Sequence, residues 1–174
     1  MRVARLLTGL LAVLLLASSS AWAAAREYEI KAAFIYNFAL FIEWPPGLMQ
    51  GNLVVGVLGH DDYGDALDEL TSHTVAQNHV VVKRIASLDE AAQCQILVVS
   101  PSEAPRYSQI FSALRGKSVL TIGETPGFAA QGGCIGFVPY RSRLRFEINT
   151  DALKQGNLKA SAKLLSLATI VTGH

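Results

Sequence analysis

The chain has little of the chemistry on which most enzymes are built. It contains two cysteines and four histidines, and no two histidines have the H-x-x-x-H spacing that places two metal ligands on one helix face. The G-x-S-x-G motif of a nucleophile elbow is missing, as are the G-x-G-x-x-G and P-loop patterns that bind phosphates. The sequence therefore predicts that the protein is not an enzyme and that it has neither a metal site nor a cofactor.

An excess of either charge is also missing. The chain has 15 Lys and Arg against 14 Asp and Glu, without a long run of one sign. Such a balance argues against nucleic acid as a partner and against direct insertion into a membrane. Repeats and Pro/Ser-rich linkers are missing too, so residues 24–174 are expected to form a single domain.

The N-terminus has the features of a cleaved signal peptide. Arg2 and Arg5 precede an uncharged run, Leu6 to Ala17, and the small-x-small sequence Ala21-Trp22-Ala23 follows. The run is shorter than the roughly 20 apolar residues of a membrane-spanning helix. Residues 1–23 are therefore predicted to be removed on export. The remaining residues would carry a net charge of −1, because two arginines leave with the signal.

Apolar runs alternate with helical patterns along the rest of the chain. The apolar runs predict strands over 53–58, 80–82, 95–99, 118–122, 134–138 and 144–148. The helical patterns predict helices over 27–43, the segment with Ala66, Leu67 and Leu70, 88–92, 107–114, 151–153 and 161–171. Short, continuously apolar strands between helices are typical of a parallel sheet covered on both faces. Because residues 139–143 are too short for a parallel crossover, the last two strands should form an antiparallel hairpin. The predicted fold is a three-layer α/β/α sandwich with a mostly parallel sheet and an antiparallel hairpin at one edge.

Polar residues follow three of the predicted strands. In open α/β sheets, ligands bind at the carboxyl ends of the strands. We therefore regard five residues as candidates for a small-ligand pocket: His60, Asp61, Ser100, Ser102 and Glu124. The alternative is that they are helix caps and solvated turns. A small-ligand-binding module outside the cytoplasm is the corresponding alternative function.

Export to an oxidising compartment raises the question of a disulfide bond between Cys94 and Cys134. In the common doubly wound strand order, one strand would separate them, at a distance on the order of 10 Å. A disulfide bond requires Cα atoms within about 7 Å. That order therefore argues against a bond, whereas another strand order would permit it.

Two segments resemble a known family. The first contains K-A-A-F-x-Y-N-F-x-x-F-x-x-W-P, from Lys31 to Pro45; the second contains Arg145-Phe-Glu-Ile-Asn149 followed by Ser161 to Ala168. Together with Cys94–Ser100 and Leu120–Ile122, they make the chain similar to the YfiR family. The resemblance implies a non-enzymatic, homodimeric periplasmic repressor of an inner-membrane diguanylate cyclase with a GGDEF domain. It also implies an OmpA-like outer-membrane lipoprotein that sequesters the repressor, raising cyclic-di-GMP and favouring exopolysaccharide and biofilm. The chain has fewer cysteines than the best-known members, which argues against regulation through a second disulfide bond.

The helix over 27–43 is apolar on more faces than one sheet can cover. We therefore expect Tyr36, Leu40 and Trp44 to lie in a homodimer interface. The alternative is that the C-terminal helix covers this second face.

The C-terminal segment offers a candidate surface for a partner. In a strand over 144–148, Arg145, Glu147 and Asn149 point to one side while Phe146 and Ile148 point to the other. Lys163 and Ser166 lie opposite the apolar stripe of the last helix, which is predicted to point Leu164, Leu165, Leu167 and Ala168 inward. We take these five polar residues as the predicted partner-binding set. The alternatives are a solvated sheet edge and ordinary packing.

Overall fold

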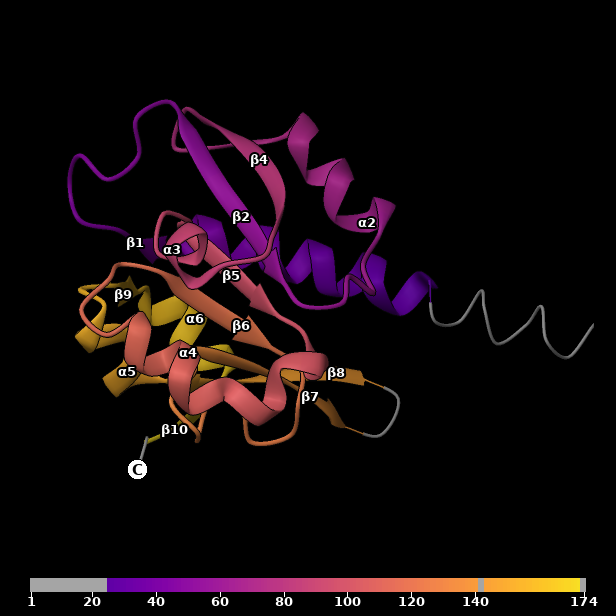
Figure 1. Cartoon of the computed structure of the whole chain (residues 1–174), viewed down its shortest axis with the longest axis vertical. Helices are drawn as coiled ribbons and strands as arrows, with labels where there is room; N and C mark the ends of the chain where they lie inside the picture. Colours follow the sequence, from indigo (N-terminus) through magenta and orange to yellow (C-terminus); the bar gives the residue numbers. More distant parts are fainter. Residues whose placement is uncertain (1–24, 141–142, 173–174) are drawn as a thin grey trace, which may run out of the picture.

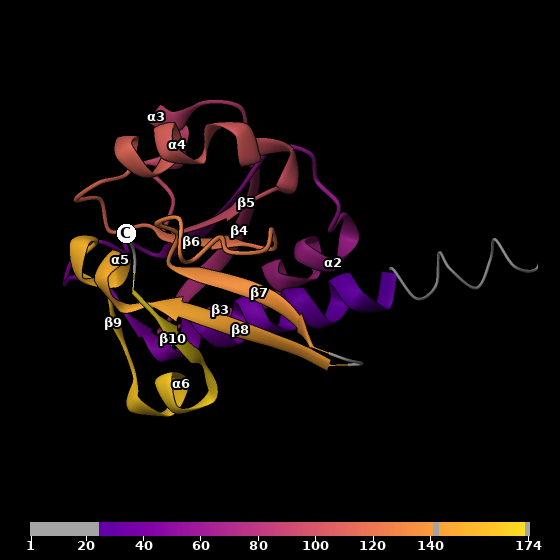
Figure 2. The ribbon, with the colours of Figure 1, turned by 90° about the horizontal axis from the view of Figure 1, so that it is seen from below.

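The computed structural model describes residues 25–140 and 143–172, so the predicted signal peptide lies outside the described residues. The chain folds into helices on both faces of a twisted sheet (Figures 1 and 2). Within the described ranges, eight strands form this sheet and two more form a small separate ladder. The predicted α/β sandwich with a mostly parallel sheet is confirmed.

The strands and helices alternate along most of the chain. The strands are β1 (Ile42–Glu43), β2 (Asn52–Leu58), β3 (Thr74–Val75), β4 (Asn78–Ile85), β5 (Ile96–Val99), β6 (Leu120–Gly123), β7 (Ile135–Tyr140), β8 (Arg143–Asn149), β9 (Lys159–Ala160) and β10 (Thr169–Val171). An N-terminal helix (25–41) precedes α2 (Asp65–Asp68), α3 (Leu88–Ala91), α4 (Tyr107–Ala113), α5 (Thr150–Gln155) and α6 (Ala162–Leu167), with 3-10 helices η1 (Glu69–Ser72) and η2 (Pro101–Arg106).

The strand order is β10-β8-β7-β6-β5-β2-β4-β3. Strands β4, β2, β5, β6 and β7 are mutually parallel, which is the doubly wound arrangement. Strands β7 and β8 form the predicted antiparallel hairpin, in which Phe137 lies opposite Phe146. The hairpin is not the outermost pair, however, because β10 adds in parallel to β8.

The prediction of one final helix over 161–171 is wrong at its C-terminal end. The helix ends at Leu167, and Thr169–Val171 pairs with Glu147–Asn149 of β8. These β-branched residues favour a strand, and their pairing covers the backbone groups that β8 would otherwise expose at an edge. Leu167, predicted to point inward, is 65% exposed as a result of this turn out of the helix.

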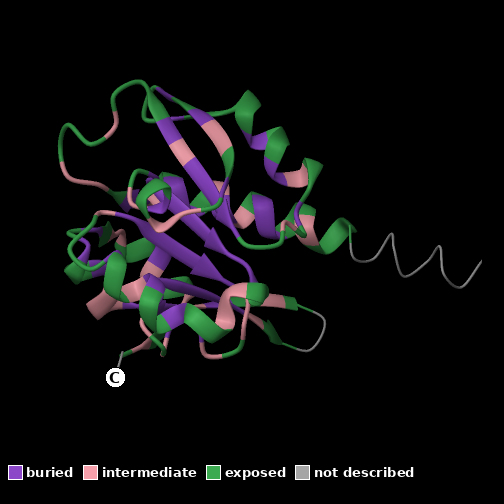
Figure 3. Ribbon diagram, viewed as in Figure 1, coloured by how far each residue is buried: buried purple, intermediate pink, exposed green. Residues whose placement is uncertain are grey.

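The N-terminal helix covers one face of the sheet. Ile35 and Phe38 are fully buried against it, and the Phe38 ring lies 4.9 Å from that of Phe146. The adjacent α6 buries Leu164 in the same cluster. Figure 3 shows that burial is concentrated in the central strands between the two helical layers. We call the side covered by the N-terminal helix the N-helix face.

The opposite side, which we call the α4 face, is covered only in part. Helices α3 and α4 pack there, and Tyr107 and Ile110 of α4 are buried in its core cluster. The connection from β6 to β7 contains turns where a crossover helix is usual. Phe128 from this connection takes the helix's place. A Cβ atom on Gly123 would lie 2.4 Å from the Phe128 ring, and one on Gly133 would lie 2.1 Å from it, so both positions must be glycine.

The two cysteines belong to different core clusters. Cys94 belongs to the core cluster on the α4 face, Cys134 belongs to that on the N-helix face, and both are free thiols. Strand β6 separates the strands that follow them. Burial raises the pKa of both thiols, which keeps them protonated and unreactive.

The Phe128 packing generates a stability prediction. Replacing Phe128 by Ala should lower the free energy of unfolding by about 3–5 kcal/mol, because it leaves a cavity between β6 and β7. Urea denaturation followed by circular dichroism measures this loss. A loss below about 1 kcal/mol, as is usual for surface positions, would show that Phe128 does not hold the crossover together.

Candidate functional site

The loops at the carboxyl ends of β2 and β5 contact each other. The Ser100 hydroxyl donates a hydrogen bond to the carbonyl of His60, and the His60 amide donates to Ser102 Oγ at 3.0 Å. Because these bonds join groups within the loops, they fix the turns and use the serine hydroxyls. They leave His60 with an exposed side chain.

The two carboxylates proposed for the same pocket are also engaged. Asp61 Oδ1 accepts from the amides of Tyr63 and Gly64, and its other oxygen lies 2.7 Å from Arg84. Glu124 pairs with Lys31. Neither of the two clefts described below includes any of the five residues. Their contacts join the loops to one another, to Arg84 and to Lys31, and the predicted ligand pocket stays a prediction.

A buried lysine was not recognised from the sequence. Lys31 of the N-terminal helix is 5% exposed and pairs with Glu124, which follows β6, and with Glu27 at 2.7 Å. Its ammonium also lies 4.5 Å from the centre of the Tyr28 ring. Burial alone would lower the pKa of Lys31, but the hydrogen bonds and charges of Glu124 and Glu27 outweigh it and raise that pKa. In the sequence, the only indication that this lysine is special is its place in the K-A-A-F segment.

The predicted partner-binding residues fall on two sides of the sheet. Arg145 and Glu147 lie on the α4 face of β8, and Phe146 and Ile148 point to the core as predicted. Lys163 and Ser166 lie on α6, across the sheet (Figure 2). The Lys163 ammonium lies 5.1 Å from the centre of the Phe41 ring. The Ser166 hydroxyl donates a hydrogen bond to the Lys163 carbonyl.

Asn149 does not belong to an accessible surface. It is 1% exposed, its amide nitrogen donates to the Ala129 carbonyl at 2.7 Å, and its oxygen accepts from the amides of Asp151 and Ala152. Asn149 is therefore the N-cap of α5. Its placement in the partner-binding set is corrected, since a partner cannot reach it.

A shallow groove of about 300 Å³ lies around Arg145 and Glu147. Its other lining residues come from three neighbouring strands: Val138, Tyr140, Phe146 and Thr169. The Arg145 guanidinium lies 5.0 Å from the centre of the Tyr140 ring, and Thr169 is paired with Glu147 across the ladder. We call this the β8 groove. It presents both signs of charge and an aromatic ring on a surface that no helix of the described chain covers.

The three residues proposed for a dimer interface differ in their availability. The Tyr36 hydroxyl donates to the Thr74 carbonyl at 3.2 Å, and its ring lies 4.8 Å from that of His73. Leu40 is 47% exposed. Trp44 is half-buried, and its indole N–H has no hydrogen-bond partner in the described chain. Leu40 and Trp44 thus remain suitable for a contact, whereas Tyr36 already has an internal role.

The described residues contain no group of three or more His, Cys, Asp or Glu side chains arranged to hold a metal ion. Within the same ranges, no helix has the length and apolar character needed to cross a membrane.

Comparison with known proteins identifies the family. A model of YfiR/HmsC-like proteins matches residues 28–169. The chain belongs to the YfiR/HmsC-like family. The match begins at Tyr28, beside the Lys31 ion pairs, and ends at Thr169 in β10, so this YfiR/HmsC-like domain includes both layers and the β8 groove. No curated protein matches the chain at a significant level.

Among solved structures, the YfiR/HmsC-like chain is similar to the ABC domain in complex with L-Trp from Streptococcus pneumonia. The TM-score is 0.50 and the sequence identity 12%, over 68% of this chain and 55% of that one. The chain therefore spans about half the length of that structure. At this identity the likeness concerns the fold, and it agrees with the mostly parallel α/β arrangement.

The Lys31 ion pairs generate a second stability prediction. Replacing Lys31 by Met should cost about 3 kcal/mol of unfolding free energy, because it leaves Glu124 largely buried and unpaired. The double variant with Glu124→Gln should lose less than the sum of the single losses. Lys154→Met is the matched control, since its pair with Asp151 is exposed and should contribute little.

The same pair determines a pH dependence. Because folding raises the pKa of Lys31, its contribution to stability is fully present below the ordinary lysine pKa of about 10.4 and is lost as pH rises through the higher folded value. Chemical denaturation of wild type and Lys31→Met from neutral to strongly alkaline pH should show the two curves converging. Parallel curves would mean that the pair does not titrate with folding.

Proposed function

We propose that the chain is an exported, non-enzymatic regulator that binds the periplasmic domain of an inner-membrane diguanylate cyclase and holds it inactive. The family match over residues 28–169 carries this proposal. The signal-peptide pattern at residues 1–23 supports the periplasmic location. Repression would lower cyclic-di-GMP and, with it, exopolysaccharide and biofilm. An OmpA-like outer-membrane lipoprotein is the proposed antagonist that sequesters the regulator.

The β8 groove is the proposed contact surface for the cyclase. Arg145 is exposed and Glu147 is half-exposed, both on a paired strand whose backbone is held by β7 and β10. A rigid sheet face loses little conformational entropy on binding. Arg145 stacked near Tyr140 combines a charge with an aromatic ring, which is a composition typical of binding hot spots.

Repression by binding requires a difference in affinity between two receptor states. A regulator that bound the active and inactive cyclase equally well would shift nothing, however tightly it bound. The proposed complex therefore places the β8 groove against a feature that only the inactive periplasmic domain presents. Lys163 and Ser166, on the other side of the sheet, would then serve a different contact or none.

Deleting the gene in its host tests the proposed function. The cellular cyclic-di-GMP concentration should rise, and should do so only while the partner cyclase is intact. Mass spectrometry of nucleotide extracts measures it. An unchanged concentration, in a strain shown to express both proteins, would remove the repressor hypothesis and favour a small-ligand-binding role.

Charge reversal in the β8 groove tests the contact surface. Glu147→Lys should weaken binding to the purified cyclase periplasmic domain by about tenfold or more, because it places two cations side by side in the groove. Glu69→Lys is the matched control: it makes the same change on η1, which packs against β4 towards the other edge of the sheet. Equal affinities for wild type and Glu147→Lys, measured by calorimetry, would exclude the groove.

The proposed homodimer uses the exposed side of the N-terminal helix. Leu40→Glu should convert the mature protein from dimer to monomer in light scattering at micromolar concentration, because it charges an apolar contact. A wild-type protein that is already monomeric under these conditions would contradict the interface.

A further inference from the structure

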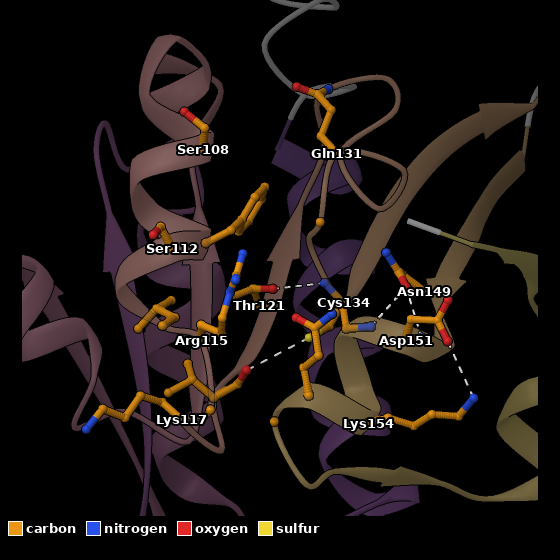
Figure 4. A pocket seen from close by; sticks show the side chains of 18 residues that line it. Ser108, Ser112, Arg115, Lys117, Thr121, Gln131, Cys134, Asn149, Asp151 and Lys154 are labelled. Carbon is orange, nitrogen blue, oxygen red and sulfur yellow. Dashed lines mark hydrogen bonds and ion pairs between the residues drawn. The ribbon is translucent and has the colours of Figure 1, made fainter. Parts of the chain in front are cut away.

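A second cleft, of about 660 Å³, opens on the α4 face at the entry ends of β6 and β7. Helix α4 forms one wall with Ser108, Phe111 and Ser112, the turn after α4 adds Arg115, and α5 forms the other wall (Figure 4). The floor includes Thr121 and Cys134, which are joined by a 2.9 Å hydrogen bond from the Cys134 amide to the threonine hydroxyl. The cleft lies apart from the strand-end loops and from the β8 groove.

The cleft exists because the β6–β7 connection contains no helix. Phe128 fills the sheet face next to Gly123 and Gly133, but the space between α4 and α5 is left open. Two glycines in its lining are in close contact with their neighbours. A Cβ atom on Gly132 would lie 3.1 Å from the Phe111 ring, and one on Gly156 would lie 3.0 Å from the carbonyl oxygen of Lys117. A side chain at either position would therefore force its neighbour to shift.

The charge of the lining is positive and only partly neutralised. Arg115, Lys117 and Lys154 line the cleft together with a single acid, Asp151. Asp151 lies 3.4 Å from Lys154, and Figure 4 shows the two side chains turned towards each other at one side. Arg115 lines the same cleft and forms no ion pair or side-chain hydrogen bond with any described residue.

We propose that this cleft binds a small organic anion, whose carboxylate or phosphate is held by Arg115 and whose apolar part lies against Phe111. A guanidinium can bind either oxyanion through two parallel hydrogen bonds. Phe111 is half-buried and packs against Tyr107 and Phe128, so its ring is held in place beside the arginine. The hydroxyls of Ser108 and Ser112, which form no hydrogen bond with the described part of the chain, supply further donors on the same wall. This inference does not depend on the proposed function.

Four probes separate the parts of this inference: benzoate, phenyl phosphate, inorganic phosphate and the neutral benzamide. Each is titrated into the purified mature protein, with binding followed by the amide resonances of Gly132, Cys134 and Gly156. Benzoate or phenyl phosphate should bind, and whichever binds more tightly identifies the oxyanion. Inorganic phosphate should bind more weakly because it lacks the apolar part, and benzamide more weakly still.

Arg115→Gln should weaken the tighter probe at least about tenfold, the range expected for losing a charge-assisted bidentate contact. Arg145→Gln, the same change in the β8 groove on the same sheet face, should leave binding unchanged. Arg115→Lys keeps the charge and should give an intermediate affinity. An unchanged thermal midpoint without ligand establishes that the variants are folded. Equal binding of benzamide and benzoate, insensitivity to Arg115→Gln, or no resonance shifts with either anion would each overturn the proposal.

Discussion

The path of the chain from β6 to β7 determines most of what is distinctive in this molecule. Two parallel strands must be joined by a crossover, and a helix normally makes it and covers the sheet. Here a run of turns makes the crossover, and the ring of Phe128 replaces the helix against Gly123 and Gly133. One side chain covers less of the sheet than a helix does. On this face the groove around β8 and the cleft between α4 and α5 are therefore both left open.

The opposite face is closed by contrast. The N-terminal helix buries Ile35 and Phe38 against the strands, and its end is held by the β1–β9 ladder and by a 2.9 Å hydrogen bond from the Ser161 amide to the Phe41 carbonyl. Its beginning is held by the pair of Lys31 with Glu124. A helix fixed at both ends makes the sheet a rigid support. The two faces thus differ in role: one supplies stability and the other supplies accessible surface.

This asymmetry suits the proposed role as a binding regulator. A partner that recognises a preformed sheet face does not have to order it, so more of the contact energy appears as affinity. The polar residues at the strand ends, which would form a ligand site in many α/β proteins, are here engaged with one another and with Arg84 and Lys31. Membership of the YfiR/HmsC-like family and the position of the open surfaces point in the same direction.

The sequence by itself determined the class of fold and much of its topology, because these follow from local patterns. Continuous apolar runs required parallel strands buried on both faces, the short link after Val138 required a hairpin, and alternation fixed which way Arg145 and Phe146 point. Only the tertiary structure decided the rest. Thr169–Val171 is a strand because β8 offers it an edge, Asn149 is buried because α5 begins beside it, and Lys31 meets a carboxylate 93 positions away. Each of these outcomes depends on a contact between segments far apart in the chain, and hydrophobic periodicity carries no information about such contacts.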